Sequence, residues 1–86
     1  MNRKWIEKDG VYKLFFSPYG NDIEYAVIKQ DQDGDWIIVS DPLNIEYDIL
    51  DAENLEEAKE EVEYKIRSSF EDEIVYYENL LKLFEE

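Results

Sequence analysis

The chain contains no cysteine and no histidine among its 86 residues. Without cysteine there is no disulfide bond and no thiolate nucleophile, and a reducing compartment, the cytoplasm, is the expected location. Without histidine, the side chain most often used as a general base and as a zinc ligand is missing as well. These two absences predict a protein that is not an enzyme and that needs no metal or other cofactor.

Glycine and long apolar runs are also scarce. The three glycines are spaced too widely for a phosphate-cradling loop, so nucleotide binding is not expected. No stretch approaches the roughly 20 apolar residues that span a bilayer, and a net charge of −14 would be repelled by an anionic membrane surface. The first six residues lead into the charged run Glu7-Lys8-Asp9 rather than an apolar segment, so we expect neither a secretion signal nor a membrane partner.

The residues that are present fit one small domain, residues 1–86, with a β part over 1–50 and an acidic helical part over 54–86. Apolar residues make up 44% of the chain and aromatic residues 15%, enough to build one shared core. The charge is uneven: residues 1–34 hold five Lys/Arg and six Asp/Glu, and residues 35–86 hold four and seventeen. The net charges are therefore −1 and −13, which predicts an acidic face in the second half.

Short runs rich in β-branched and aromatic residues predict three strands, at residues 11–16, 23–28 and 36–39. Turn-forming residues at 17–22 and 31–34 connect them, which favours an antiparallel meander. Residues 4–7 offer a fourth strand through an Asp9-Gly10 turn, and the alternation over residues 45–49 suits a short edge strand. The predicted fold class is α+β, with a three-stranded or four-stranded antiparallel sheet followed by helix.

A loop of two or four residues in the second hairpin would place five apolar residues on one face, which is the predicted core face. These are Ile23, Tyr25, Val27, Trp36 and Ile38. The opposite face would carry Ala26, Ile28, Ile37 and Val39. That set is more apolar than a solvent-exposed face usually is, which indicates that something else covers this face of the sheet. Core packing is also predicted for four aromatic residues, Tyr12, Tyr25, Trp36 and Tyr77.

The second half has helical periodicity. Asn54 followed by Glu57 is a capping pattern, and a predicted buried stripe follows at helical spacing. The stripe is Leu55, Ala58, Val62 and Ile66. A second capping pattern at residues 68–71 predicts either one long helix bent near Ser68 and Ser69 or two helices, although no Gly or Pro enforces a break and an uninterrupted helix stays open. A further apolar stripe comprises Phe70, Ile74, Tyr77, Leu81 and Phe84.

Alternating aspartates at residues 31–35 resemble a calcium-binding EF-hand loop, but their registration does not fit. With Gly34 at the sixth position, Lys29 would occupy the first ligand position and Ser40 would replace the bidentate glutamate at the twelfth. A β-turn in which Asp33-Gly34 supplies positive φ angles is predicted instead.

The acidic side of the helical part is the predicted partner-binding surface. Its carboxylates outnumber the nearby cations Lys59, Lys65 and Arg67, and such crowding of like charge costs stability unless a basic partner offsets it. The predicted partner-binding residues are Glu56, Glu57, Glu60, Glu61, Asp41, Glu46, Asp48, Asp51, Glu71 and Asp72. The plainer interpretation is that these carboxylates form only a solvated face.

In its small size, acidity and order of strands before glutamate-rich helix, the whole chain resembles small phage-encoded inhibitors that imitate nucleic acid, including anti-CRISPR proteins. That resemblance implies a protein that blocks the DNA-binding groove of a nuclease. The middle third also resembles HicB-like antitoxins, through strands at 25–28 and 36–39, Asp41-Pro42, and the helix opening at Leu55-Glu56-Glu57-Ala58. It departs from them in lacking the glycines expected in the intervening loop.

The predicted function is therefore a non-enzymatic inhibitor that binds a basic nucleic-acid-binding protein, such as a CRISPR effector or another DNA-handling nuclease, by imitating nucleic-acid charge. Direct nucleic-acid binding is not expected, because phosphates are held by basic surfaces and this chain has the opposite net sign. The alternative is an antitoxin-like or structural protein-interaction module, including a homodimer, with a merely solvated acidic face.

Overall fold

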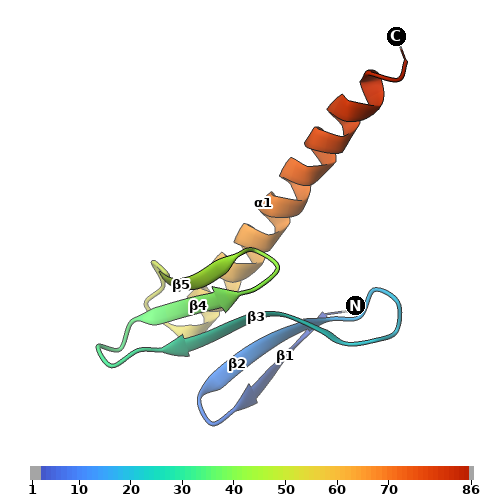
Figure 1. Ribbon diagram of the computed structural model, residues 1–86. Helices are drawn as coiled ribbons and strands as arrows, with labels where there is room; N and C mark the ends of the chain where they lie inside the picture. The colour runs from blue at the N-terminus through green and yellow to red at the C-terminus, as the bar shows by residue number, and fades with distance from the viewer. Residues whose placement is uncertain (1–2, 86) are drawn as a thin grey trace.

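A computed structural model describes residues 3–85, which form a five-stranded antiparallel sheet followed by one helix (Figure 1). The elements are β1 (Arg3–Lys8), β2 (Val11–Phe16), β3 (Ile23–Gln30), β4 (Trp36–Ser40), β5 (Ile45–Ile49) and α1 (Leu55–Lys82). The predicted α+β class is confirmed. The count of three or four strands was too low, because the segments at 4–7 and 45–49 both join the sheet. Met1, Asn2 and Glu86, which the predicted domain includes, lie outside the described residues.

The sheet is a simple meander in which each strand pairs with the next one in the sequence. Lys8 pairs with Val11, so the first hairpin turns through two residues, Asp9 and Gly10, whose φ angles are 55° and 78°. Two positive φ angles match the twist of a two-residue hairpin, which explains why a glycine occurs here. The predicted Asp9-Gly10 turn is confirmed.

The second hairpin corrects the predicted core face. Gln30 pairs with Trp36, leaving five connecting residues, and within them the Gly34 N–H donates to the Asp31 carbonyl at 3.1 Å. Gly34 has a φ of 83°, so the connection combines a tight turn with a left-handed residue. An odd number of connecting residues reverses the parity expected for two or four, and Ile28 therefore pairs with Ile38.

The core lies between α1 and one face of the sheet. Ala26 and Ile28 were predicted on the face opposite to Trp36 and Ile38, but they lie on the same, helix-covered face, whereas Val27 lies on the other. The buried cluster on the helix-covered face consists of Leu14, Ala26, Ile28, Trp36, Ile38, Leu50, Ala58, Val62 and Ile66. Three of its members come from the predicted helical stripe, which α1 thus presents to the sheet.

A β-bulge decides the position of Tyr25. Leu14 pairs with Ala26 and the next residue, Phe15, with Glu24, so Tyr25 is an extra residue in β3. The Tyr25 carbonyl accepts a hydrogen bond from the Ser40 hydroxyl at 2.7 Å, and its ring lies 4.8 Å from that of Phe16. Tyr25 therefore packs against the core, as expected, although its neighbours in β3 alternate differently.

The helix runs without interruption over 28 residues, so of the predicted alternatives the single long helix forms and the two-helix alternative was wrong. The side chain of Asn54 accepts the Glu57 N–H at 2.9 Å, which confirms the predicted start. Serine lowers helix stability only by tenths of a kcal/mol, about 0.5 at most, so two serines do not break a helix that packing supports on one side.

The helix is longer than the sheet that it covers. Figure 1 shows α1 passing behind the sheet and continuing well beyond it to the C-terminus. The radius of gyration is 15.5 Å, against about 12 Å for a compact chain of 86 residues. We call residues 55–69 the packed half of α1 and residues 70–82 the projecting half. Within residues 3–85, no helix combines the length and apolar character needed to cross a membrane.

Candidate binding surfaces

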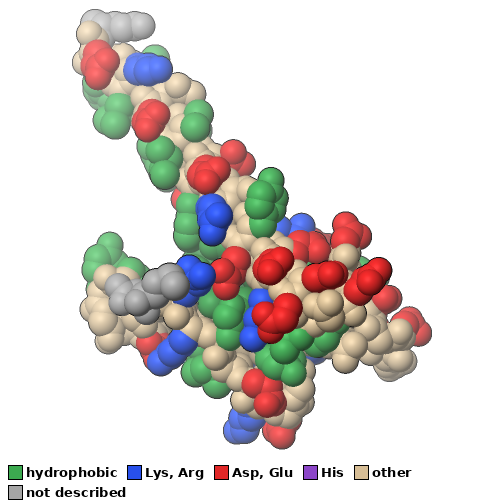
Figure 2. All heavy atoms as spheres, turned by 180° about the vertical axis from the view of Figure 1, so that it is seen from behind, with side chains coloured by type: hydrophobic (Ala, Val, Ile, Leu, Met, Phe, Trp, Pro, Cys, Tyr) green, Lys and Arg blue, Asp and Glu red, His purple; other side chains and the backbone are tan. Residues whose placement is uncertain are grey.

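The outward side of α1 carries a row of exposed carboxylates. Glu56, Glu60 and Glu71, which we call the acidic ridge, point away from the sheet because they lie roughly opposite Val62 on the helix. Figure 2 shows Asp and Glu side chains gathered over the packed half. Within residues 3–85 none of these three glutamates forms a salt bridge, although the exposed Arg67 lies on the same side of the helix, four residues before Glu71.

Two of the predicted partner-binding glutamates make hydrogen bonds that stabilise the fold. Glu57 accepts the Glu53 N–H at 3.0 Å, completing the reciprocal cap at the start of α1. Glu61 accepts the Asp51 N–H at 2.9 Å and lies 3.9 Å from the Lys65 ammonium. Their carboxylates are thus committed to the connection between β5 and α1, and substituting them would change the fold as well as the charge.

The other predicted carboxylates are spread over the molecule. Asp41 begins the turn after β4, where its carbonyl accepts the Asn44 N–H at 3.0 Å, and Asp48 pairs with Ile38 in β5. Glu46 lines a shallow groove with Lys29 on the face of the sheet that α1 leaves uncovered. Asp72 lies on the projecting half. The structure therefore brings Glu56, Glu60 and Glu71 together on one side, while the loop carboxylates face other directions.

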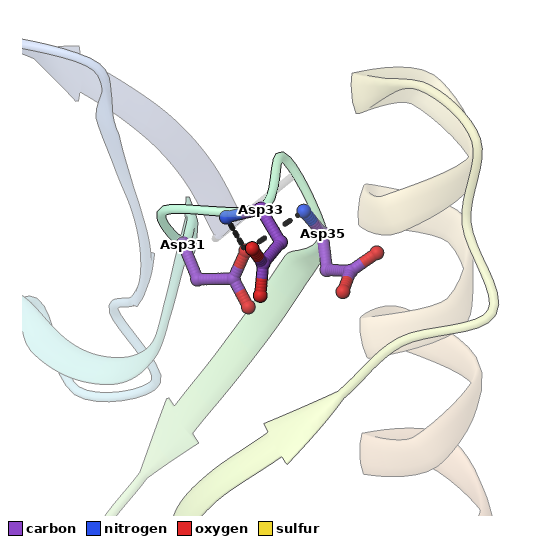
Figure 3. Close-up of side chains that lie close together, drawn as sticks. All are labelled: Asp31, Asp33 and Asp35. Atoms are coloured by element: carbon purple, nitrogen blue, oxygen red, sulfur yellow. Dashed lines mark hydrogen bonds between the residues drawn. The ribbon is translucent and has the colours of Figure 1, made fainter.

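Three aspartates of the β3–β4 connection lie close together, as Figure 3 shows. One carboxylate oxygen from each of Asp31, Asp33 and Asp35 lies within 4.8 Å of the others, and among residues 3–85 this is the one group of acidic side chains spaced to share a metal ion. Asp31, however, already uses both oxygens. Its Oδ1 accepts the Asp33 and Asp35 N–H groups at 2.9 Å each, and its Oδ2 accepts the Tyr47 hydroxyl at 3.1 Å.

The hydrogen bonds of this turn also determine its electrostatics. Desolvation raises the pKa of Asp31, but the hydrogen bonds from the Asp35 and Asp33 backbone, from Tyr47 and from the Gly34 backbone outweigh it and leave the pKa below its usual value. The same contact raises the pKa of Tyr47, since the phenol proton bonds to the Asp31 carboxylate. These contacts account for the Asp31 geometry as a turn cap, without a bound ion.

The uncovered face of the sheet, which we call the open face, carries charges of both signs: Lys4 and Lys13 form ion pairs with Asp22 and Glu24, and Lys29 shares a groove with Asp31, Asp33 and Glu46. Strand pairing places all four lysines of the first half on it, with Glu24 and Glu46 as its strand carboxylates. These lysines are Lys4, Lys8, Lys13 and Lys29. Between them lie apolar side chains, namely Ile6, Val11, Phe15, Val27, Ile37, Val39, Tyr47 and Ile49.

This surface was not predicted from the sequence, although part of the signal was available. The spacing of the lysines and the pairing of β1 with β2 and of β2 with β3 place their side chains on one face. The net charge of −1 for residues 1–34 gives no sign of this gathering, because the acids of that segment lie in turns, on the helix-covered side or, as Glu24 does, beside the lysines.

The projecting half of α1 is the third unpartnered surface. Ile74, Tyr77 and Leu81 are 55%, 59% and 62% exposed, so Tyr77, predicted to pack in the core, does not. Phe70 is where the helix leaves the sheet: its ring lies 5.6 Å from Tyr25 and 6.5 Å from Phe16. Together with Pro18 and Ile23, these three rings line an open apolar groove at the sheet end, continuous with the exposed stripe.

None of the three surfaces could be compared with a known binding site. The chain matches no protein-family model, and no curated protein or solved structure is significantly similar to it.

Proposed function

We propose that the protein is a non-catalytic inhibitor whose acidic ridge occupies the basic nucleic-acid-binding groove of a partner, such as a CRISPR effector or another DNA-handling nuclease. The observation that carries the proposal is the ridge of exposed carboxylates itself. Glu56, Glu60 and Glu71 lie on the outer side of α1, and none of them forms a salt bridge within residues 3–85. Glu56 and Glu60 are about 6 Å apart along the helix axis and Glu71 lies about 16 Å further on, so the helix offers a basic groove a row of negative charges like that of a nucleic-acid strand.

The distribution of charge supports this direction of binding. The four lysines of the first half lie on the far side of the sheet from α1, so they do not shield the ridge from an approaching cationic surface. Long-range attraction between surfaces of opposite sign speeds association and sets orientation. The absence of cysteine and histidine from the sequence supports steric blocking rather than catalysis.

The test is inhibition of DNA cleavage by a panel of purified nucleases that includes CRISPR effectors. Glu56→Lys combined with Glu60→Lys reverses two of the three ridge charges while sparing the structural glutamates Glu57 and Glu61. Affinity for an inhibited nuclease should fall by about tenfold or more. Excess duplex DNA should compete with the wild-type protein, and rising salt should weaken its binding.

The matched control makes the same charge change elsewhere. Asp33→Lys combined with Asp35→Lys alters exposed side chains in the β3–β4 connection and should leave inhibition unchanged. If the ridge variant inhibits as strongly as the wild type, or if duplex DNA does not compete for the nuclease, the proposed mode of action is wrong.

An interaction or oligomerising module is the second candidate function, and one observation favours it. The projecting half of α1 exposes an apolar stripe that includes Ile74, Tyr77 and Leu81. Exposed apolar surface of this extent on a small protein is typical of an interaction site. The two surfaces adjoin on the helix, because Ile74 follows Glu56 by 18 residues, which is five full turns.

A further inference from the structure

Apolar residues occupy the outward side of α1 once the helix has passed the sheet. Ile74 follows Glu56 by 18 residues, which is five full turns, and Val75 lies about 40° from Glu71 around the helix axis. Their side chains are 55% and 56% exposed. Leu81, about two turns after Ile74, is 62% exposed. We call Ile74, Val75 and Leu81 the outer patch, and it continues the acidic ridge along the same side of the helix.

The fold of this chain gives no reason for apolar side chains at these positions. The sheet lies on the opposite side of α1, where Val62 is fully buried, and α1 contains no glycine or proline at which its projecting half could fold back. Isoleucine and valine are also weaker helix formers than glutamate or leucine. Ile74 and Val75 therefore lower the stability of the helix while exposing apolar surface, which indicates a contact with another molecule.

The carboxylates around the outer patch determine what can cover it. Glu71 lies three residues before Ile74 and Glu78 four residues after it, so both are its neighbours on the helix surface. Both are exposed and neither forms a salt bridge within residues 3–85, although Lys82 follows Glu78 by one turn. Over the whole projecting half the balance is four carboxylates against that one lysine. The charges therefore favour a surface that is apolar at its centre and cationic around it.

A second copy of this chain does not offer such a surface. Two copies that pack along their outer patches in parallel oppose Glu71 to Glu71 and Glu78 to Glu78, and antiparallel packing centred on Ile74 and Val75 opposes Glu71 of one copy to Glu78 of the other. On the open face, two lysines are held in ion pairs and a third shares a groove with carboxylates. The charges thus favour a different protein with a basic surface, which is the kind of partner proposed for the ridge.

Position along the helix also assigns the patch and the ridge to one partner. Ile74 lies about 4.5 Å beyond Glu71 along the helix axis, and from Glu56 to Leu81 the ridge and the patch span about 38 Å. The helix does not turn between them, since residues 55–82 are uninterrupted. A basic groove that takes the ridge therefore meets the outer patch without a change of direction.

We propose that the outer patch binds an apolar surface, bordered by Lys or Arg, at the end of the same basic groove that takes the acidic ridge. The ridge steers the encounter and the patch holds the complex. The patch also distinguishes this partner from other nucleic-acid-binding proteins, because a groove that lacks the apolar surface gains only the charge contacts. In assigning one partner to both surfaces, the inference rests on the proposed function.

The test compares two pairs of substitutions on opposite sides of the projecting half. The patch variant, Ile74→Ser with Leu81→Ser, removes most of the outer patch. The control variant, Tyr76→Ser with Leu83→Ser, has the same spacing and similar exposure, 59% and 65% against 55% and 62%, but lies about 160° away, on the sheet side. Circular dichroism checks that both variants are folded.

The first measurement is surface plasmon resonance with a nuclease that the wild-type protein inhibits. The patch variant should dissociate about tenfold faster or more, with an association rate within about twofold of the wild type. Its loss of affinity should also be the same at low and high salt, unlike that of the ridge variant with Glu56→Lys and Glu60→Lys. An unchanged dissociation rate, or an equal effect of the control variant, overturns the inference.

The second measurement needs no nuclease. One synthetic helical peptide carries a row of leucines flanked by lysines, and a matched peptide has serine in place of each leucine. The wild-type protein should bind the leucine peptide about tenfold more tightly in a fluorescence anisotropy titration. The patch variant should lose most of this preference, and the control variant should keep it. Equal binding of the two peptides by the wild type, or loss of the preference in the control variant alone, contradicts the assigned surface.

The two measurements separate failure of the inference from failure of the proposed function. If the wild type inhibits a nuclease and the patch variant binds that nuclease with unchanged kinetics, the inference is wrong and the proposed function stands. If no nuclease in the panel is inhibited while the preference for the leucine peptide depends on the outer patch, the proposed function is wrong. The assignment to a nuclease groove is then wrong with it, and the patch binds a basic, apolar surface of another protein.

Discussion

The two halves of α1 share one apolar periodicity but differ in what that periodicity does. In the packed half, Ala58 and Val62 are fully buried against the sheet. In the projecting half, Tyr76 and Leu80 lie five turns further along, in line with Ala58 and Val62, and are 59% and 37% exposed. An amphipathic pattern therefore shows which side of a helix is apolar, but it does not show which segment, if any, buries that side.

The largest expected effect on stability comes from a charge placed in the buried side of the packed half. Val62→Asp places a charge where the native side chain has no solvent exposure, which should cost more than about 4 kcal/mol and unfold the domain. Leu81→Asp, in the projecting half, should change the stability of the dilute monomer by less than about 0.5 kcal/mol, since Leu81 is 62% exposed. Urea unfolding followed by circular dichroism measures both. Similar destabilisation by the two variants would show that the projecting half packs in the monomer.

A smaller effect concerns the sheet on which the packed half rests. Ser40 is 2% exposed, donates to the Tyr25 carbonyl at 2.7 Å and accepts the Leu43 N–H at 3.3 Å. Ser40→Ala should therefore leave polar groups unsatisfied at the bulge and cost about 1–3 kcal/mol. Ser68→Ala, near the start of the projecting half, serves as the control and should be neutral or slightly stabilising. A Ser40→Ala protein as stable as the wild type would mean that water or a neighbour replaces both bonds.

The two ends of α1 should differ in how strongly they affect the stability of the whole domain. Asn54→Ala removes the acceptor of the Glu57 N–H at the packed end and should cost about 1 kcal/mol, because this end unfolds together with the sheet. Leu83→Gly at the other cap should have almost no effect on global unfolding, since fraying there is not coupled to the core. Hydrogen exchange at individual amides distinguishes the cases. Equal global destabilisation by the two substitutions would contradict the division of the helix into halves.

The smallest effect is a pH dependence in the body of the domain. The folded-state pKa of Asp31 lies below its usual value, so its contribution to stability is present above that value, 3.8, and is lost as the pH falls through the folded pKa. Asp31→Asn should flatten the acid limb of a plot of urea midpoint against pH. Tyr47→Phe, which removes one of the hydrogen bonds, should flatten it less. Identical acid limbs for Asp31→Asn and the wild type would rule out this linkage.

Much of the local structure could be predicted because its causes are local. The Asp9-Gly10 turn follows from the φ freedom of glycine, and the start of α1 follows from the Asn54 cap. The α+β class follows in the same way from two kinds of periodicity in the two halves of the chain. The two-helix alternative at Ser68 was wrong because the backbone N–H groups there already bond to carbonyls one turn earlier in α1. A capping side chain therefore gains nothing by replacing those hydrogen bonds.

The candidate site was predictable only in part. The outward position of Glu56 and Glu60 follows from helical spacing, but the hydrogen bonds that commit Glu57 and Glu61 to the fold involve residues 53 and 51, whose placement depends on how the chain enters the helix. The faces of β3 and β4 were matched wrongly, so the predicted core face was wrong. One residue more or less in the β3–β4 connection exchanges the two faces of every strand that follows, so a small error in loop length had a large consequence.

By itself, then, the sequence determined the kinds of element, their order, the starting cap of α1 and the acidity of its outer side, because each depends on residues within a few positions of one another. Tertiary structure alone decided which strand face meets the helix, where the lysines gather and which half of the apolar stripe is buried. Those outcomes depend on the pairing registers of the strands and on the length of α1 relative to the sheet. Both are relations between segments that are far apart in the sequence, and the local preferences of residues do not determine them.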